Sequence, residues 1–332
     1  MEIMVKGKKQ SCNNKKRGYN WNMDYYLAMD GGGSTLRMAI GTQEQLVAEL
    51  QGASSNPYGV GWDGVHRHLR DLIEQGLRTQ HIPSDAIVSI VLGSAGMGRN
   101  QEQAETAAFL HTILPNALVK VTNDAEIFLV GALDDLSGIA LIAGTGSIAV
   151  GRTADGILVR SGGYGWRLGD EGSGYGIALN AIRRTLLSRD KEDLETDLGK
   201  QIVAFFHLKE LDDIITLVND QATTKRQIGD FCPVVLDLAA RQDKLAMDIL
   251  DKGADSLVLL VDSIIKRIPP DHARKVVCGG GLLARKHLYQ QIVKDKLAMA
   301  FPSYEFSFSP KKRAVDGAMM LARAIARKKP GT

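Results

Sequence analysis

Cysteine is scarce in this sequence, and no hydrophobic run is long. The 332 residues include three cysteines, Cys12, Cys232 and Cys278, and none of them forms a CxxC pair. An odd number of widely spaced cysteines excludes a disulfide framework and gives no support to a zinc site. A reducing, cytoplasmic compartment fits this usage. No apolar run reaches the roughly 18 residues of a membrane-spanning helix, so no membrane is expected as a partner.

The net positive charge of the chain is confined to the first 22 residues. Those residues hold six Lys or Arg against one acid, a net charge of +5, whereas the whole chain carries +3 and the remainder therefore −2. The body of the chain thus gives no reason to expect nucleic acid as a partner. The N-terminal segment also lacks the apolar core of a secretory signal. We expect residues 1–23 to be a disordered basic tail, or an over-long start with Met23 as the true first residue.

The predicted elements occur twice in the same order. Hydrophobic periodicity predicts strands over 25–30, 35–40, 45–50, 86–92 and 118–122, and helices over 62–80, 101–114 and 125–133. From 138 the order begins again, with strands over 139–143, 148–152, 157–161, 275–278 and 304–309, and helices over 285–297 and 314–327. A helix-rich insertion spans 174–266. The duplication predicts an α/β protein of two βββαβαβα lobes, 24–135 and 136–330, with a ligand cleft between the lobes.

A glycine cluster follows the first predicted strand. The sequence Asp30-Gly-Gly-Gly-Ser-Thr35 places three glycines directly after an acid. Gly32 and Gly33 let the backbone approach a ligand closely, and their N–H groups, with the hydroxyls of Ser34 and Thr35, are suitable donors to phosphate. Asp30 is placed to hold Mg²⁺ through water. The alternative is a plain hairpin turn, but a turn needs only one or two glycines.

Two further glycine clusters lie in the second half. Gly144-Thr145-Gly146-Ser147 occupies the equivalent turn of the second repeat, so the two turns could hold the β- and γ-phosphates from both sides of a cleft. Gly279, Gly280 and Gly281 follow a late strand, where bare backbone suits an adenosine. The P-loop and protein-kinase glycine patterns are both absent, which disfavours those phosphate-binding folds.

Five motifs, taken in order, resemble those of N-acetylglucosamine kinases and, more widely, of the BadF/BadG/BcrA/BcrD ATPase family. They are DGGGS at 30–34, VTND at 121–124, GTGS at 144–147, GGYGWRLGDEGSGY at 162–175 and CGGG at 278–281. The resemblance covers residues 25–327. It implies an actin-like, ribonuclease H-like fold, ATP and Mg²⁺ as cofactors, a small sugar as substrate and a homodimer.

The resemblance also implies roles for individual residues. Asp124 matches the catalytic Asp that faces the sugar 6-hydroxyl. The residues that match sugar contacts are Asn56, Gly163, Tyr164, Gly165 and Asp170. The residues that match nucleotide contacts are Ser34, Thr145, Gly279, Gly280 and Gly281. Thr35 departs from the pattern, because relatives often have Lys or Arg there.

Local structure offers a simpler interpretation of three of these residues. Asp124 precedes a predicted helix and suits a helix N-cap. Asn56 precedes Pro57 and suits a turn. Asp170 and Glu171 precede another helix, where acids favour the helix dipole. For Asp124 the resemblance outweighs the cap, and the two roles are compatible.

The function expected from these observations is ATP-dependent phosphorylation of the 6-hydroxyl of N-acetylglucosamine or a close relative. Glucosamine, N-acetylmuramic acid and glucose stay open as substrates. A different class, a nucleotide-switched ATPase that activates a partner protein, also stays open. Activators of that kind in the same wide family bind an iron–sulfur cluster through cysteines, and Cys12, Cys232 and Cys278 do not fit that pattern.

Overall fold

The chain folds into two compact units, the first of which is not continuous in sequence. A computed structural model describes residues 23–191, 196–269 and 274–327. One unit comprises residues 1–131 and 313–332, and the other comprises residues 132–312. The expected N-terminal tail lies outside the described residues, apart from Met23. No helix in the described ranges is long and apolar enough to cross a membrane.

The first unit is an α/β layer structure around one five-stranded sheet. Its elements are β1 (Tyr25–Gly31), β2 (Thr35–Gly41), β3 (Leu46–Ala53), α1 (Pro57–Gln80), η1 (Ser84–Ala86), β4 (Ile87–Ser94), α2 (Asn100–Ile113), β5 (Leu118–Thr122), most of α3 (Asp124–Leu133) and α11 (Ala314–Arg327).

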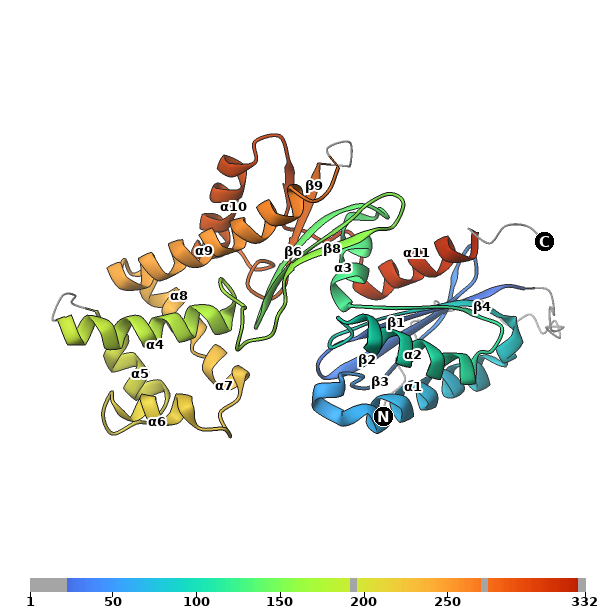
Figure 1. Ribbon diagram of the computed structural model, residues 1–332, viewed down its shortest axis with the longest axis horizontal. Coiled ribbons are helices and arrows are strands. Elements are labelled where there is room, and N and C mark those ends of the chain that lie inside the picture. Colours follow the sequence, from blue (N-terminus) through green and yellow to red (C-terminus); the bar gives the residue numbers. More distant parts are fainter. Residues whose placement is uncertain (1–22, 192–195, 270–273, 328–332) are drawn as a thin grey trace, which may run out of the picture. The chain divides into compact units, whose positions relative to one another are not determined.

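The strand order of the first sheet is β3-β2-β1-β4-β5. Strands β1, β2 and β3 form an antiparallel meander, while β4 and β5 run parallel to β1. The short turns between the first three strands leave no room for a crossover helix, which is why this part is antiparallel. Helices α1 and α2 cover one face of the sheet and α11 covers the other (Figure 1).

The core of the first unit lies between the sheet and α1 and α2. Leu27 and Met29 alternate along β1 and belong to the same buried cluster as Val65 and Leu69 of α1. The period of two in the strand and of three to four in the helix brings these apolar faces together. On the other face, the Ser89 hydroxyl of β4 donates to the Ala322 carbonyl oxygen of α11 at 2.7 Å.

The second unit repeats the sheet and adds a group of helices. Its elements are β6 (Gly138–Ala143), β7 (Ser147–Arg152), β8 (Leu158–Gly162), α4 (Gly174–Lys191), α5 (Leu198–Phe205), α6 (Asp213–Asn219), α7 (Lys225–Gly229), α8 (Cys232–Ala240), α9 (Lys244–Ile265), β9 (Lys275–Gly279), α10 (Leu288–Ala300) and β10 (Glu305–Ser307).

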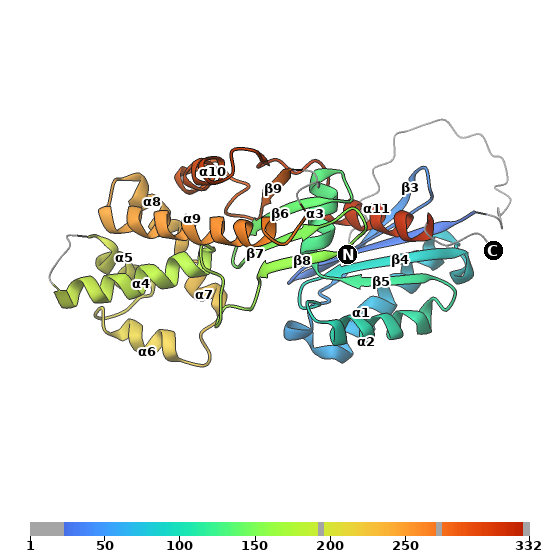
Figure 2. The same cartoon turned by 45° about the horizontal axis from the view of Figure 1, so that its top comes forward.

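The order of the second sheet, read from its other side, is β8-β7-β6-β9-β10. It matches the order β3-β2-β1-β4-β5 of the first sheet, with β6 to β10 in the places of β1 to β5. The predicted duplication is therefore confirmed, as is the insertion of helices between the third and fourth strands of the repeat. Helices α4 and α9 run along the same part of the second unit (Figure 2). Both contribute to one buried cluster, with Ile177 and Ala181 from α4 and Leu257 and Val261 from α9.

The last helix belongs to the first unit, whereas the sequence analysis assigned 136–330 to one lobe. Helix α11 packs on β1 and β4, and the chain passes from one unit to the other between Gly131 and Ala132 and again between Lys312 and Arg313. The strongly apolar face of α11 explains this position, because the first sheet offers it a matching apolar surface. Val315, Ala318, Leu321 and Ala322 are buried there.

Candidate functional site

The turn between β1 and β2 is a three-residue loop of exposed backbone. The Gly32 N–H donates to the Thr35 carbonyl oxygen at 2.9 Å. Within the described chain, the N–H groups of Gly33 and Ser34 and the Ser34 hydroxyl have no hydrogen-bond partner. A Cβ atom at Gly33 would meet no atom within 4 Å, so packing does not explain that glycine. The loop is suited to donate to an anion that approaches its backbone.

The segment that precedes α1 is tied to this turn. The Ser54 hydroxyl donates to the Gly32 and Gly33 carbonyl oxygens at 3.2 and 3.1 Å. Two residues later, the Asn56 side-chain oxygen caps α1 by accepting from the Tyr58 N–H at 3.1 Å. Asn56 is therefore the N-cap of α1, where its sequence context suggested a turn. Its amide nitrogen still carries two N–H donors.

Two carboxylates, those of Asp30 and Asp124, lie at the carboxyl ends of strands of the first sheet. Asp30 pairs with Gly93 of β4, and Gly93 pairs with Thr122 of β5, two residues before Asp124. The helix cap next to Asp124 is provided by Asn123, whose side-chain oxygen accepts from the Glu126 N–H at 2.8 Å. Asp124 is the first residue of α3, and it is exposed.

The environment raises the pKa of both carboxyl groups. Desolvation raises the pKa of Asp30, and the Arg37 guanidinium, 3.6 Å away, opposes the shift. Although solvent reaches Asp124, the surrounding protein desolvates its carboxyl group and is the main cause that raises its pKa. The like charge of Asp30 adds to this, while the N–H groups at the start of α3 oppose it. Like charges at one sheet edge favour the binding of a cation there.

The equivalent turn of the second unit is also short, but its closing hydrogen bond spans two residues instead of three. The loop between β6 and β7 also has three residues, and the Gly144 N–H donates to the Gly146 carbonyl oxygen at 2.9 Å. Among the described residues, the N–H groups of Thr145 and Gly146 and the Thr145 hydroxyl have no partner. Thr145 is exposed. This turn therefore offers the same kind of donors as the turn of the first unit.

The third glycine cluster lies against this second turn. Gly280 has a φ of +87°, and a Cβ atom there would collide with the Ala143 backbone at the end of β6. A Cβ atom at Gly144 would lie 3.5 Å from the Gly281 nitrogen. The fold thus brings together two of the predicted nucleotide-binding segments, which are more than a hundred residues apart in sequence.

Asp170 joins the second turn to the helical insertion. Its side chain is 5% exposed, and its Oδ1 accepts from the Ser147 N–H at 3.0 Å. Its Oδ2 accepts from the Lys225 ammonium, on α7, at 2.6 Å. A carboxylate has about four acceptor positions, so these two contacts leave capacity for a sugar hydroxyl. The sugar-binding role of Asp170 stays a prediction.

The loop that leads from β8 to α4 is rich in positive-φ glycines. Gly163 and Gly165 have φ values of +67° and +90°. Tyr164 between them is 59% exposed, with the Arg160 guanidinium 5.7 Å from its ring centroid. Trp166 instead packs on Tyr175, with ring centroids 5.5 Å apart. Of these two aromatic side chains, Tyr164 is the one open to a ligand.

Comparison with known sequences assigns the chain to a family. A profile of the BadF/BadG/BcrA/BcrD ATPase family matches residues 27–322. The chain belongs to this family. The family resemblance predicted from the five motifs is therefore confirmed.

Curated relatives of this ATPase family member are amino-sugar kinases. An N-acetylmuramic acid/N-acetylglucosamine kinase from Clostridium acetobutylicum is 32% identical over 305 residues, which cover 91% of this chain and 99% of that protein. An N-acetyl-D-glucosamine kinase from Dictyostelium discoideum is 28% identical, with coverage of 85% and 92%. A glucosamine kinase from Vibrio cholerae is 27% identical, with coverage of 90% and 96%.

Solved structures of low sequence identity share the fold. A candidate N-acetylglucosamine kinase from Chromobacterium violaceum has a TM-score of 0.66 at 22% identity and covers 90% of this chain and 99% of its own. A ROK hexokinase from Thermus thermophilus has a TM-score of 0.57 at 14% identity, with coverage of 92% and 100%. These similarities confirm the predicted actin-like architecture.

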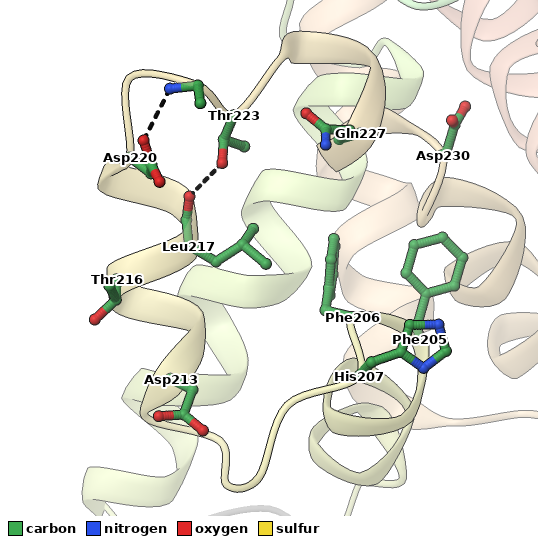
Figure 3. Close-up of a pocket in the computed structure, with 11 residues that line it drawn as sticks. Phe205, Phe206, His207, Asp213, Thr216, Leu217, Asp220, Thr223, Gln227 and Asp230 are labelled. Carbon is green, nitrogen blue, oxygen red and sulfur yellow. Dashed lines mark hydrogen bonds between the residues drawn. The ribbon is translucent and has the colours of Figure 1, made fainter.

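One pocket in the second unit of this ATPase family member is not lined by residues of the glycine turns. It measures about 740 Å³ and lies among α5, α6 and α7 (Figure 3). Several of its polar groups are already used in local turns. The Asp220 carboxylate accepts from the Ala222 N–H, and the Thr223 hydroxyl donates to the Leu217 carbonyl oxygen. The glycine turns, where donors are unpaired, are therefore the better candidate site for an anion.

Lys225 is the residue of this site that sequence reasoning missed. It lies 55 residues from Asp170 in a helix of the insertion, with no motif around it. Its position beside the second turn follows from the packing of α7 against α4 and the turn. A Cβ atom at Gly229 of α7 would lie 3.6 Å from the Thr145 methyl carbon. A lone Lys in a polar segment carries no signal that sequence analysis could use.

Proposed function

We propose that this chain is an ATP-dependent amino-sugar kinase that phosphorylates the 6-hydroxyl of N-acetylglucosamine or a close relative. The observation that carries the proposal is the pair of equivalent three-residue turns with unpaired backbone donors, in a chain whose curated relatives phosphorylate amino sugars. Fold similarity alone would not support it, because a ROK-family transcriptional regulator shares this fold at a TM-score of 0.52.

Both units contain residues that are proposed as phosphate donors. In the first unit they are Gly32, Gly33, Ser34 and Thr35. In the second they are Thr145 and Gly146, with Gly279, Gly280 and Gly281 beside them for the nucleoside. Backbone N–H groups suit this task because they are fixed in direction and stabilise the charge that develops on the transferred group.

Asp124 is the residue proposed to act on the sugar hydroxyl. The Asn123 cap leaves the Asp124 carboxylate available at an exposed position. It would orient the 6-hydroxyl and accept its proton late, once bond formation to phosphorus has made the oxygen acidic. A raised pKa makes Asp124 a somewhat better base than an ordinary Asp. Asn56, Gly163, Tyr164, Gly165 and Asp170 are the proposed sugar contacts.

Mg²⁺ is the cation that the proposal requires, and Asp30 is its proposed ligand. No group of three or more His, Cys, Asp or Glu gathers as a metal cage within the described chain. Magnesium does not need one, because it is usually held by one or two carboxylates, waters and substrate phosphates. The two carboxylates at the sheet edge fit that pattern. When bound, the ion neutralises phosphate charge.

The cysteines of this chain are poorly suited to the alternative class, an activator that binds an iron–sulfur cluster. Cys232 and Cys278 are buried, and burial raises the pKa of the Cys232 thiol to about 12 and that of Cys278 well above its usual value. Cluster ligation requires accessible thiolates. Cys12 lies outside the described residues. The homodimer and the cytoplasmic location stay predictions.

The experiment that tests the proposal is ADP release with Mg²⁺-ATP over a panel of sugars. The panel contains N-acetylglucosamine, N-acetylmannosamine, glucosamine, N-acetylmuramic acid, glucose and a blank without sugar. We expect strong stimulation by one amino sugar, which would also identify the substrate. Equal ADP release in every tube would contradict the proposal and favour the ATPase activator.

A further inference from the structure

The ammonium of Lys225 lies directly beside the glycine turn of the second unit. Its Nζ is 2.6 Å from the Asp170 Oδ2, and the Lys225 side chain is 26% exposed. A Cβ atom added to Gly146 would be 2.7 Å from this Nζ and also 2.7 Å from the Asp170 Oδ1. The ion pair therefore occupies the space next to the turn, and a side chain at position 146 would have to displace it.

The same carboxylate holds the turn itself. Asp170 accepts from the Ser147 N–H, and the Ser147 hydroxyl donates to the Glu171 carbonyl oxygen at 2.8 Å. Asp170 has a φ of +72°, which is uncommon for a residue with a side chain and costs conformational energy. The fold thus maintains a strained residue whose two carboxylate oxygens fix a cation and a backbone turn at one place.

We propose that Lys225 binds a nucleotide phosphate at the Gly144–Ser147 turn and that Asp170 is the positioning residue that holds Lys225 there. An ammonium has three donors, so Lys225 can keep its bond to Asp170 and still donate to a phosphate oxygen. The unpaired N–H groups of Thr145 and Gly146 supply further donors to the same anion. The proposal rests on the proposed function, because the anion it names is the polyphosphate of the nucleotide.

The test compares nucleotide binding by the full chain and four variants. Affinity for Mg²⁺-ATP, ADP and adenosine is measured by calorimetry, with adenosine followed by competition. The variants are Lys225→Met, Asp170→Asn, the double variant, and Arg226→Met as the matched control. Arg226 is the next residue of α7, its side chain is 86% exposed, and its ion pair with Asp230 is 3.8 Å long.

We expect Lys225→Met to weaken ATP and ADP binding about tenfold or more and to leave adenosine binding unchanged. Arg226→Met should bind all three ligands as the parent does. The double variant separates the loss of the ammonium from the effect of leaving Asp170 unpaired. It should bind ATP as weakly as Lys225→Met, whereas Asp170→Asn alone should weaken ATP binding by a smaller factor, because the ammonium remains but loses the carboxylate that positions it. The double variant also lacks the unpaired buried charge, so it keeps the test valid if Lys225→Met fails to fold.

Three results would overturn the proposal. They are ATP binding by Lys225→Met within twofold of the parent, recovery of parental affinity in the double variant, and an equal loss of adenosine binding. The proposed function can fail separately. ATP binding without stimulation by any sugar would contradict the kinase, while the variants would still decide the role of Lys225.

Discussion

At the scale of single residues, substitutions of Asp30 and Asp124 give the most direct tests of the proposed site. Asp124 is the first residue of α3 but does not cap it, because Asn123 does. Replacement of Asp124 by Asn should therefore preserve the helix and remove only the carboxylate. We expect turnover to fall at least about 100-fold, the usual contribution of a positioned proton acceptor, while ATP binding is retained.

Steady-state ADP release and calorimetry measure these two quantities. Asp71→Asn on the exposed face of α1 is the matched control and should behave as the parent. Near-normal turnover of Asp124→Asn would remove Asp124 from the proposed role.

The pH dependence of activity follows from the same two residues. In the proposed role the carboxylate form of Asp124 is the active one, and its pKa is raised above the ordinary value of about 3.9. As the pH falls through this raised pKa, kcat/KM should decrease, and it should stay level above it. Asp30→Asn removes the like charge and lowers the pKa of Asp124, so the acid limb should move to lower pH. A pH profile of kcat/KM at saturating Mg²⁺ measures the shift, and an unmoved limb would contradict this coupling.

At the scale of elements, α3 and α11 meet through glycines. A Cβ atom at Gly317 of α11 would collide with the Ile127 carbonyl oxygen and the Gly131 nitrogen of α3. A Cβ atom at Gly131 would likewise collide with the Arg313 carbonyl oxygen. The two helices thus touch backbone to backbone, and this contact positions the helix that begins at Asp124.

Gly317→Ala should therefore destabilise the first unit, although alanine is the better helix former. We expect a loss of about 1–3 kcal/mol in the free energy of unfolding, the usual cost of overpacking. Gly199→Ala in α5 is the control, because its Cβ atom would lie 3.6 Å from the nearest side-chain carbon. It should be neutral or stabilise by up to about 1 kcal/mol. Urea unfolding measures both, and the same sign for both changes would contradict the contact.

At the scale of the whole molecule, the chain leaves the first unit, builds the second and returns. Residues 132–312 form the second unit between two parts of the first. The returning segment is structural, since α11 supplies one face of the first sheet and buries Val315, Ala318 and Leu321. A division of the sequence into two consecutive lobes does not show that the first unit depends on the C-terminal segment.

In a chain that ends at Lys312 the first unit should fail to fold, because α11 is missing. The second unit still has its complete sequence. The uncovered face of β1 and β4 would expose apolar surface, so we expect aggregation and loss of ATP-dependent turnover. Solubility and ADP release measure this. A chain that ends at Arg327 keeps every described residue of α11 and should match the parent. A soluble, active chain ending at Lys312 would contradict the assignment of α11 to the first unit.

The sequence by itself determined the features that depend on local order. Apolar periodicity gave strands and helices that agree with the structure to within a few residues for most elements, and the duplicated order gave the two sheets. The glycine turns at 32–34 and 144–146 were visible because a turn is encoded by adjacent residues. The five motifs identified the family, which the profile match then confirmed.

Only the tertiary structure decided which distant residues meet. Nothing near Lys225 in sequence indicates Asp170, because their pairing depends on how α7 packs beside the second turn. The choice of Asn123 over Asp124 as the cap depends on the side-chain geometry of two adjacent residues that are both good caps. The place of α11 in the first unit depends on which sheet presents the matching apolar face. Local sequence specifies each element and its faces, while the partners of those faces are selected by packing across the whole chain.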